Sequence, residues 1–577
     1  MLKRWTLARA LRVGVGRCSC EGEAETTACS SSDVAQMHER TLTGTLIPAL
    51  FLVAVATSIA LFWWWLGRPV AMPASDAAGE KLQCVSYAPF RGNQSPLQAD
   101  THIGSAQIED DLARLKSLTD CIRTYSIEHG LDQVPEIARR RGLKVIQGLW
   151  LSSHPEKNRE QVETVVRLTR QYPDVIQSVV VGNEVLLRGE LSADNVAAFL
   201  REVKGRTGMP VTYADVWEFW LRHRDLASAV DFVTIHILPY WEDFPIPAES
   251  AAAHIESIRE RMAAAFPGKE ILIGETGWPS AGRMREGALP SLSNQARVLQ
   301  EVLAVAKRNG YRVNVIEAFD QPWKRQLEGT VGGYWGLFDD ASRQPKFAWG
   351  QPVSDHAFWR QQAAGGIAFA ALIFAAALWS RRREVSRAGW IAIAAIALAG
   401  GSMVGWAVEL MFYESLGIGG WLRSAALVAA AVVTPVIFAI LLVRGEGLPS
   451  FADVLAGRGE AVISRTQWMA GLLVAATSVI AIQVALGLVF DPRYKDFPFA
   501  PLTAAVVPIA LVAYAARNAE NGSRAAERIA AATLALSAIY IVFNEGFANW
   551  QSVWLCVLLL VLALSLVRFR LSRAAQS

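Results

Sequence analysis

Two glutamates, each preceded by a run of apolar residues, carry the clearest chemical signal in the chain. Residues 179–183 (Val-Val-Val-Gly-Asn) precede Glu184, and residues 271–274 (Ile-Leu-Ile-Gly) precede Glu275. Runs rich in β-branched residues predict buried strands, which would leave each carboxyl group at the end of a strand. Two carboxyl groups about 5 Å apart are the proton donor and the nucleophile that a retaining glycosidase uses to cleave a glycosidic bond.

Short apolar runs alternate with amphipathic stretches between Lys81 and about Trp349, and this alternation predicts parallel strands joined by helices. The predicted strands are Leu82–Tyr87, Cys121–Ser126, Leu143–Trp150, Ile176–Gly182, Val211–Ala214, Phe232–Ile237, Ile271–Gly274 and Val313–Phe319. Eight such units in about 270 residues match the size of a (β/α)8 barrel. An open doubly wound sheet is the alternative, but the segment contains no G-x-G-x-x-G phosphate loop. We therefore expect an α/β fold, a (β/α)8 TIM barrel, over residues 80–352.

The polar residues of this segment gather where the predicted strands end. These residues are Tyr125, Trp150, Glu184, Asp215, His236, Glu275 and Asp320. Active sites of such barrels lie at the C-terminal ends of the strands, so this placement favours an enzyme. In this count Glu184 ends the fourth strand and Glu275 ends the seventh.

The motifs around the two glutamates resemble those of glycoside hydrolase family 17, the β-1,3-glucanase and glucanosyltransferase barrels of the 4/7 superfamily. The residues that carry the resemblance are Asn183-Glu184, the run Gly-Glu-Thr-Gly-Trp-Pro-Ser at 274–280, and the openings at 85–90 and 122–125. The resemblance covers about residues 82–350. It implies a retaining double displacement on a β-glucan, with Glu184 as general acid/base and Glu275 as nucleophile.

Several polar and aromatic residues near the strand ends could hold a sugar chain. The candidates are Asn183, Tyr125, Tyr213, His236, Tyr240, Trp241, Trp278 and Trp323. The Asn183 amide could bind the 2-hydroxyl group, where hydrogen bonds strengthen in the transition state. Tyr213 or His236 could orient Glu275. The alternative for the aromatic residues is packing at the barrel mouth, and a single histidine on an apolar strand is more often a hydrogen-bonded core residue.

The histidines and cysteines show no spacing typical of a metal site, and we expect neither a metal nor a cofactor. Cys18, Cys20 and Cys29 form only a weak pattern of this kind. Cys84 and Cys121 fall on adjacent predicted strands, where a disulfide is conceivable. Neighbouring parallel strands rarely offer disulfide geometry, so two buried thiols are the favoured expectation.

The remainder of the chain has the composition of a membrane protein, with 52% hydrophobic and 19% charged residues overall. Leu46–Leu66 carries no charge and is long enough to cross about 30 Å of hydrocarbon, so we expect a transmembrane signal anchor at 43–66. Seven further apolar spans are predicted at 364–380, 388–408, 424–443, 468–489, 499–516, 527–544 and 551–568. They predict an all-α membrane domain of about seven helices at 362–570.

Positive charges alternate between the loops of this domain. They lie at Arg381–Arg383 and Arg387, at Arg444, Arg458 and Arg465, at Arg517, Arg524 and Arg528, and at Arg568, Arg570 and Arg573. The intervening loops, 409–423, 490–498 and 545–550, carry few. Cytoplasmic loops carry the excess of Lys and Arg, so this pattern places the barrel outside the cytoplasm. Residues 1–42 are then a cytoplasmic, disordered segment, and the start of translation at Met1 or Met37 stays open.

The expected protein is a multi-pass enzyme of a bacterial inner membrane with a periplasmic barrel. Its resemblance is to the membrane-bound bacterial type associated with β-(1,3;1,6)-glucan biosynthesis, which implies a transglucosylase that forms β-1,6 linkages. An endo-β-1,3-glucanase is the alternative, and a non-catalytic glucan-binding or export scaffold is a more distant one. The expected partners are a β-glucan or gluco-oligosaccharide, membrane lipid and a separate glucan synthase. A net charge of +3 gives no support for nucleic-acid binding.

Overall fold

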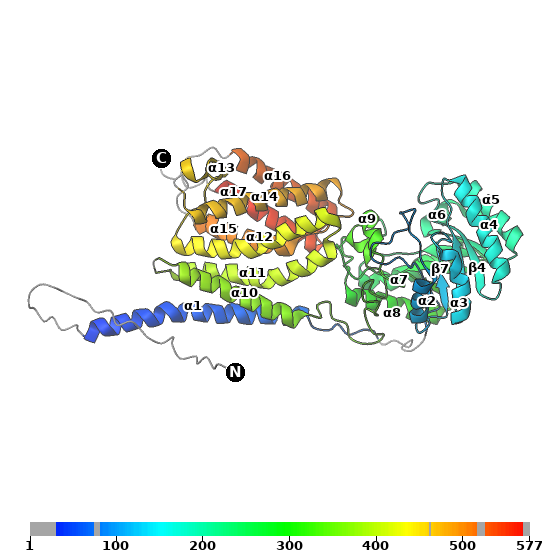
Figure 1. Ribbon diagram of the computed structural model, residues 1–577, viewed down its shortest axis with the longest axis horizontal. Helices are drawn as coiled ribbons and strands as arrows, with labels where there is room; N and C mark the ends of the chain where they lie inside the picture. Colours follow the sequence, from blue (N-terminus) through cyan, green and yellow to red (C-terminus); the bar gives the residue numbers. More distant parts are fainter. Residues whose placement is uncertain (1–30, 74–80, 383, 461–462, 516–524, 569–577) are drawn as a thin grey trace, which may run out of the picture. The chain divides into compact units, whose positions relative to one another are not determined.

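A computed structural model describes residues 31–73, 81–382, 384–460, 463–515 and 525–568. The chain divides into two compact units, residues 1–50 and 51–577, and helix α1 (Ser31–Leu66) runs from the first into the second. The second unit contains a β/α region followed by a bundle of apolar helices (Figure 1). Residues 1–30 of the expected leader, with its three cysteines, lie outside the described residues. Residues 31–42 belong to α1.

Eight parallel strands form a closed barrel. They are β1 (Cys84–Ser86), β2 (Cys121–Arg123), β3 (Lys144–Leu149), β4 (Ile176–Asn183), β5 (Val211–Val216), β6 (Val233–His236), β7 (Ile271–Thr276) and β8 (Arg312–Val315). Each strand pairs with its successor in the sequence, and β8 pairs with β1. The predicted TIM barrel followed by a helical region is confirmed.

Helices between the strands cover the barrel (Figure 1). They are α2 (Ser105–Leu115), α3 (Val134–Arg141), α4 (Pro155–Gln171), α5 (Ala193–Thr207), α6 (Trp217–Arg222), α7 (Ala248–Ala265) and α8 (Leu292–Asn309). Helix α4 shows why these segments fold as helices. Its buried residues Val162, Val165, Val166 and Thr169 recur every three or four positions, which places them on one face. The opposite face is polar, so the helix packs on the strands in one orientation.

Alternate residues of the strands enter two separate buried clusters. Val85, Ile122 and Val179 belong to a large cluster shared with the helices. Their neighbours Cys84, Cys121 and Val180 belong to a small separate cluster that contains no helix residues. Successive side chains of a strand point to opposite faces, so the first cluster packs the helices against the barrel and the second fills its interior.

Cys84 and Cys121 form a disulfide, so the expectation of two buried thiols is wrong. The register pairs Val85 with Ile122, and the two cysteines therefore stand opposite one another on β1 and β2. Both side chains enter the barrel interior, and their Cα atoms are 4.5 Å apart. A disulfide spans Cα distances of about 4.4–6.8 Å, so the register supplies the geometry that parallel neighbours usually lack.

Seven helices in the described part of the chain are long and apolar enough to cross a membrane, judged by length and composition. They are Leu46–Leu66 within α1, α10 (Trp359–Ser380), α11 (Arg387–Glu414), α12 (Gly417–Arg444), α14 (Arg465–Phe490), α16 (Ala525–Glu545) and α17 (Trp550–Arg568). The eighth expected span is the shorter apolar helix α15 (Phe499–Ala515). Most residues of α15 are buried, which is typical of a helix enclosed by others. A short helix, α13 (Phe451–Glu460), follows α12 and was not expected from the sequence.

Candidate active site

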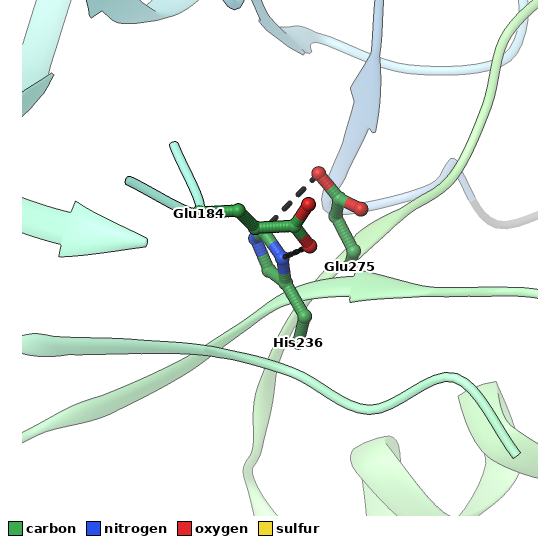
Figure 2. Close-up of side chains that lie close together, drawn as sticks. All are labelled: Glu184, His236 and Glu275. Atoms are coloured by element: carbon green, nitrogen blue, oxygen red, sulfur yellow. Dashed lines mark hydrogen bonds and ion pairs between the residues drawn. The ribbon is translucent and has the colours of Figure 1, made fainter. Parts of the chain in front are cut away.

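Glu184 and Glu275 lie close together at the C-terminal ends of two strands (Figure 2). Glu275 is part of β7, and Glu184 directly follows the last residue of β4 with a left-handed backbone φ of 53°. One oxygen of each carboxyl group lies within 4.8 Å of the other. Retaining glycosidases hold their carboxyl groups about 5–5.5 Å apart, and inverting enzymes about 6.5–9.5 Å. The spacing therefore suits a retaining reaction.

His236, the last residue of β6, contacts both carboxyl groups. Its Nδ1 lies 2.7 Å from Glu184 Oε1, and its Nε2 lies 3.5 Å from Glu275 Oε1. Arg123 Nη1 approaches the same Nε2 at 3.4 Å. Because a carboxylate oxygen can only accept, the ring proton that makes the short contact with Glu184 sits on Nδ1. His236 therefore donates a hydrogen bond to Glu184.

Arg123, on β2, joins the two glutamate motifs. Its side chain is fully buried, and Nη1 donates to Glu275 Oε1 at 3.1 Å and to the Gly274 carbonyl at 2.7 Å. Nη2 donates to Asn183 Oδ1 at 2.5 Å. The guanidinium thus places a positive charge beside the expected nucleophile and fixes the amide next to Glu184. Arg123 lies in one of the motifs that carry the family resemblance, but its position in the sequence does not predict this role.

Opposing influences set the pKa of Glu184. Burial favours its protonated form, but the hydrogen bond from His236 and the nearby Arg188 and Arg123 outweigh burial. The pKa of Glu184 consequently lies below its ordinary value. The carboxylate form, which can accept a proton, is favoured in this arrangement.

A second buried acid lies after β8. Glu317 is 1% exposed, and both of its oxygens accept hydrogen bonds from Lys324 Nζ at 2.9 Å. Burial raises the pKa of Glu317 to about 7, although Lys324 opposes the rise. Both residues line the same cleft as Glu184 and Glu275. Neither residue could be predicted as part of the site from the sequence, because neither belongs to a recognisable motif.

The two glutamates face a cleft of about 830 Å³, within the usual range for ligand pockets. Of the residues expected to bind substrate, the cleft is lined by Tyr125, Asn183, Trp241 and Trp323. Trp150 also lines it, and the Arg188 guanidinium lies 4.1 Å from the centre of that ring. Aromatic rings from separate strand ends therefore surround the two carboxyl groups.

The other expected contacts lie behind the cleft wall. The Tyr213 hydroxyl donates to Asp215 and accepts from the Leu186 amide, so it holds the segment after Glu184. Tyr240 donates to the Arg283 carbonyl, and Trp278 Nε1 donates to the Leu289 carbonyl. These three aromatic residues are almost fully buried and pack the barrel mouth. His236 is also fully buried and reaches the site through its hydrogen bonds.

Glu184, His236 and Glu275 also offer three ligand atoms within 4.8 Å of one another, as a metal site would. The surroundings do not suit a cation, because Arg123 Nη1 lies 3.1 Å from Glu275 Oε1 and 3.4 Å from His236 Nε2. A metal ion bound to those atoms would face a buried guanidinium charge. The donor set fits a hydrogen-bonded carboxylate pair better than a metal centre.

Comparison with known proteins places the barrel among glucan-active proteins. Residues 84–336 match the BtgE/BtgC glycoside hydrolase domain. The probable beta-glucosidase btgE of Aspergillus fumigatus is 30% identical over 226 residues, which are 38% of this chain and 39% of that protein. The glucan 1,3-beta-glucosidase of Candida albicans is 26% identical over 255 residues, 40% of this chain and 82% of that protein.

The solved structures include a glycoside hydrolase family 17 beta-1,3-glucanosyltransferase from Rhizomucor miehei. It is 23% identical, covers 47% of this chain and 97% of that chain, and has a TM-score of 0.41. The chain spans about two fifths of the length of the first curated relatives that it matches. Residues 84–336 of the chain form a glycoside hydrolase domain of the BtgE/BtgC type.

Proposed function

We propose that the chain is a membrane-anchored, retaining β-glucan transglucosylase that forms β-1,6 linkages. The observation that carries this proposal is the pair Glu184 and Glu275, whose oxygens lie within 4.8 Å of each other in an aromatic cleft. This separation suits a double displacement through a covalent glucosyl-enzyme. The match to a glycoside hydrolase domain supports the same chemistry.

In the first step Glu275 attacks the anomeric carbon and Glu184 gives its proton to the departing glycosidic oxygen. The bond to the leaving sugar breaks as an ester bond to Glu275 forms. In the second step Glu184 removes a proton from an incoming hydroxyl group, whose oxygen attacks the same carbon and releases Glu275. Arg123, which donates to Glu275 Oε1, holds the nucleophile in position throughout.

Glu184 has to hold a proton in the first step and accept one in the second. Two neighbouring carboxylate charges repel each other, so the charge of Glu275 makes protonation of Glu184 easier before the first step than after it. That charge disappears when Glu275 is esterified. The hydrogen bond from His236 then acts without this opposition and favours the Glu184 carboxylate, which is the base that the second step needs.

The bundle of apolar helices favours transfer over hydrolysis, because it is larger than an anchor requires. A barrel held at a membrane where glucan chains emerge would meet sugar hydroxyl groups as acceptors. The alternative is an endo-β-1,3-glucanase, in which water is the acceptor and the same two glutamates act. A glucan-binding or export scaffold remains the distant alternative, since binding alone needs neither carboxyl group.

Contacts between the barrel and the bundle support a location outside the cytoplasm. Arg325 Nη2 donates to the carbonyls of Tyr413 and Ser415, Thr330 donates to Asp496, and Arg283 pairs with Glu545. These bundle residues lie in or at the edge of the three loops that carry few positive charges. The charge rule assigns such loops to the non-cytoplasmic side, which we propose is the periplasm of a bacterial inner membrane. Reporter fusions after residue 352 and within the 381–387 loop would test this orientation.

The test of the reaction uses the full chain in detergent with a defined β-1,3-gluco-oligosaccharide, followed by mass and linkage analysis of the products. Products longer than the substrate with new β-1,6 bonds are the expected result. Exclusively shorter products would show a glucanase. No products from the wild type, with unchanged glucan production in cells that carry Glu275→Gln, would favour the scaffold.

A further inference from the structure

The loop between α14 and α15, residues 491–498, reaches the catalytic cleft of the barrel. Arg493 and Tyr494 line the same cleft as Glu184 and Glu275. They belong to the apolar helical region and stand far from the barrel in the sequence. The cleft wall is therefore built from both regions of the chain.

Polar contacts fix this loop against the barrel. Thr330 Oγ1 donates to Asp496 Oδ2 at 2.7 Å, and Arg283 Nη1 donates to the Lys495 carbonyl at 3.2 Å. Gly329 has a φ of +70°, and a Cβ atom there would lie 2.4 Å from the Tyr494 carbonyl oxygen. A side chain at Gly329 would therefore both strain the backbone and push the loop away.

A buried ion pair and an amide network hold the neighbouring loop of the bundle to the same part of the barrel. Arg283 Nη2 lies 2.5 Å from Glu545 Oε1, and the two side chains are 3% and 8% exposed. Asn549 donates to the Met284 carbonyl at 2.9 Å, and the Met284 amide donates to Gln551 at 2.8 Å. A buried, hydrogen-bonded pair of this kind fixes one geometry, because either charge alone would be left unpaired. Arg283 joins the two loops, because it pairs with Glu545 and also donates to the Lys495 carbonyl.

At the cleft the loop meets Trp241, one of the residues expected to bind sugar. The Tyr494 ring packs edge-on against the Trp241 ring, with centroids 6.2 Å apart. The Arg493 guanidinium lies 5.6 Å from the centre of the same ring. Trp241 and Tyr494 are only partly buried, and Arg493 is exposed. Together they place two aromatic rings and a guanidinium group in the wall of the cleft.

We propose that Arg493 and Tyr494 form, with Trp241, a subsite for a glucosyl unit of a β-linked glucan chain. The aromatic rings offer surfaces to the apolar C–H face of the pyranose, and the guanidinium group offers donors to its hydroxyl oxygens. The inference rests on the proposed action on β-glucan. It gives the helical region a direct part in determining which glucan substrates bind. A glucan long enough to extend from the two glutamates to Trp241 would use this subsite, and a short substrate would not.

The test compares Tyr494→Ala and Arg493→Ala with wild type in the full chain, in detergent. Substrates are a β-1,3-linked glucohexaose and an aryl β-glucobioside. For the hexaose we expect kcat/KM to fall about tenfold, mainly through KM, and to fall more than for the aryl substrate. Tyr494→Phe, which keeps the ring, should retain most of the hexaose activity. Lys495→Ala is the matched control, because the Lys495 side chain pairs with Asp491 and does not line the cleft.

Binding separates failure of the subsite from failure of the reaction. The Kd of the hexaose is measured for Glu275→Gln alone and with Tyr494→Ala added, and Tyr494→Ala should weaken binding about tenfold. Hexaose binding or turnover that is unaffected by both loop variants would overturn the subsite while leaving the β-glucan function standing. Binding that weakens without any turnover in wild type would overturn the reaction and keep the subsite. No binding at all would overturn both.

Discussion

Replacement of Arg123 by lysine tests whether this residue positions the catalytic pair. Arg123 is fully buried and donates to Glu275, to the Gly274 carbonyl and to Asn183. Lysine keeps the charge but has a single nitrogen, so it cannot reach acceptors that two separate Nη atoms now serve. At least one charge-assisted hydrogen bond would be lost.

A hydrogen bond to a charged group contributes about 1.5–3 kcal/mol, which corresponds to a factor of about 10 to 150. We expect Arg123→Lys to lower kcat by that factor and to change KM for the gluco-oligosaccharide much less, because Arg123 is not part of the cleft lining. The assay measures kcat and KM separately on the full chain, with thermal unfolding as a check of folding. Arg123→Ala should be far worse, since it leaves Glu275 buried and without its charge partner, at a cost of about 3–5 kcal/mol in stability.

A folded Arg123→Lys variant with a kcat within about twofold of wild type would refute the positioning role of Arg123. A loss that appeared entirely in KM would also refute it, because Arg123 would then act on substrate binding. His236, which contacts both glutamates, provides a comparison. His236→Gln should alter the pH dependence of kcat, since it removes the hydrogen bond that lowers the pKa of Glu184.

Three further predictions follow from the site and the core. Glu184→Ala and Glu275→Ala should both lose turnover, and azide should rescue them with opposite stereochemistry: a β-glycosyl azide from Glu184→Ala and an α-glycosyl azide from Glu275→Ala. The same anomer from both would contradict the assigned roles. Burial raises the pKa of Glu317 from 4.5 to about 7, so the folded state binds its proton more tightly than the unfolded state. The free energy of unfolding should therefore decrease as the pH rises from about 4.5 to 7. Glu317→Gln should make this decrease smaller in denaturant titrations, and an unchanged dependence of the free energy on pH would contradict the prediction. Cys84→Ala with Cys121→Ala removes a disulfide that closes a loop of 37 residues, which should cost about 4 kcal/mol in unfolding experiments, and a reductant should no longer lower the Tm of this variant.

The catalytic glutamates could be predicted because each ends an apolar run, and an apolar run followed by a lone carboxyl group is a local signal. Arg123 carries no such signal, since an arginine within a short strand is normally predicted to lie on the surface. Its burial becomes evident only when the strand is known to be part of a closed barrel. Trp241 and Trp278 look alike in the sequence, but the first lines the cleft and the second is 0% exposed. Whether a ring faces the cleft or the packing behind it depends on the course of its loop.

The disulfide and the 491–498 loop show a different limit. Cys84 and Cys121 could be assigned to adjacent strands, but their direct opposition depends on a register that a shift of one residue would destroy. Tyr494 could not be connected with the active site at all, because nothing near it in the sequence indicates which surface its loop contacts. Contacts between remote segments follow from tertiary packing, and composition and periodicity do not encode them.

The left-handed backbone at Glu184 sets stability against activity at this position. A non-glycine residue with a φ of 53° costs about 1–2 kcal/mol. The hydrogen bonds from the Glu184 amide to the Ala214 carbonyl and from His236 to the Glu184 carboxylate hold the residue in this conformation. Glu184→Gly would relieve that strain, but it would also remove the carboxyl group that the acid/base step requires. Selection for thermal stability alone would therefore favour an inactive enzyme. Screens that report only folding would enrich substitutions at Glu184, which catalysis requires.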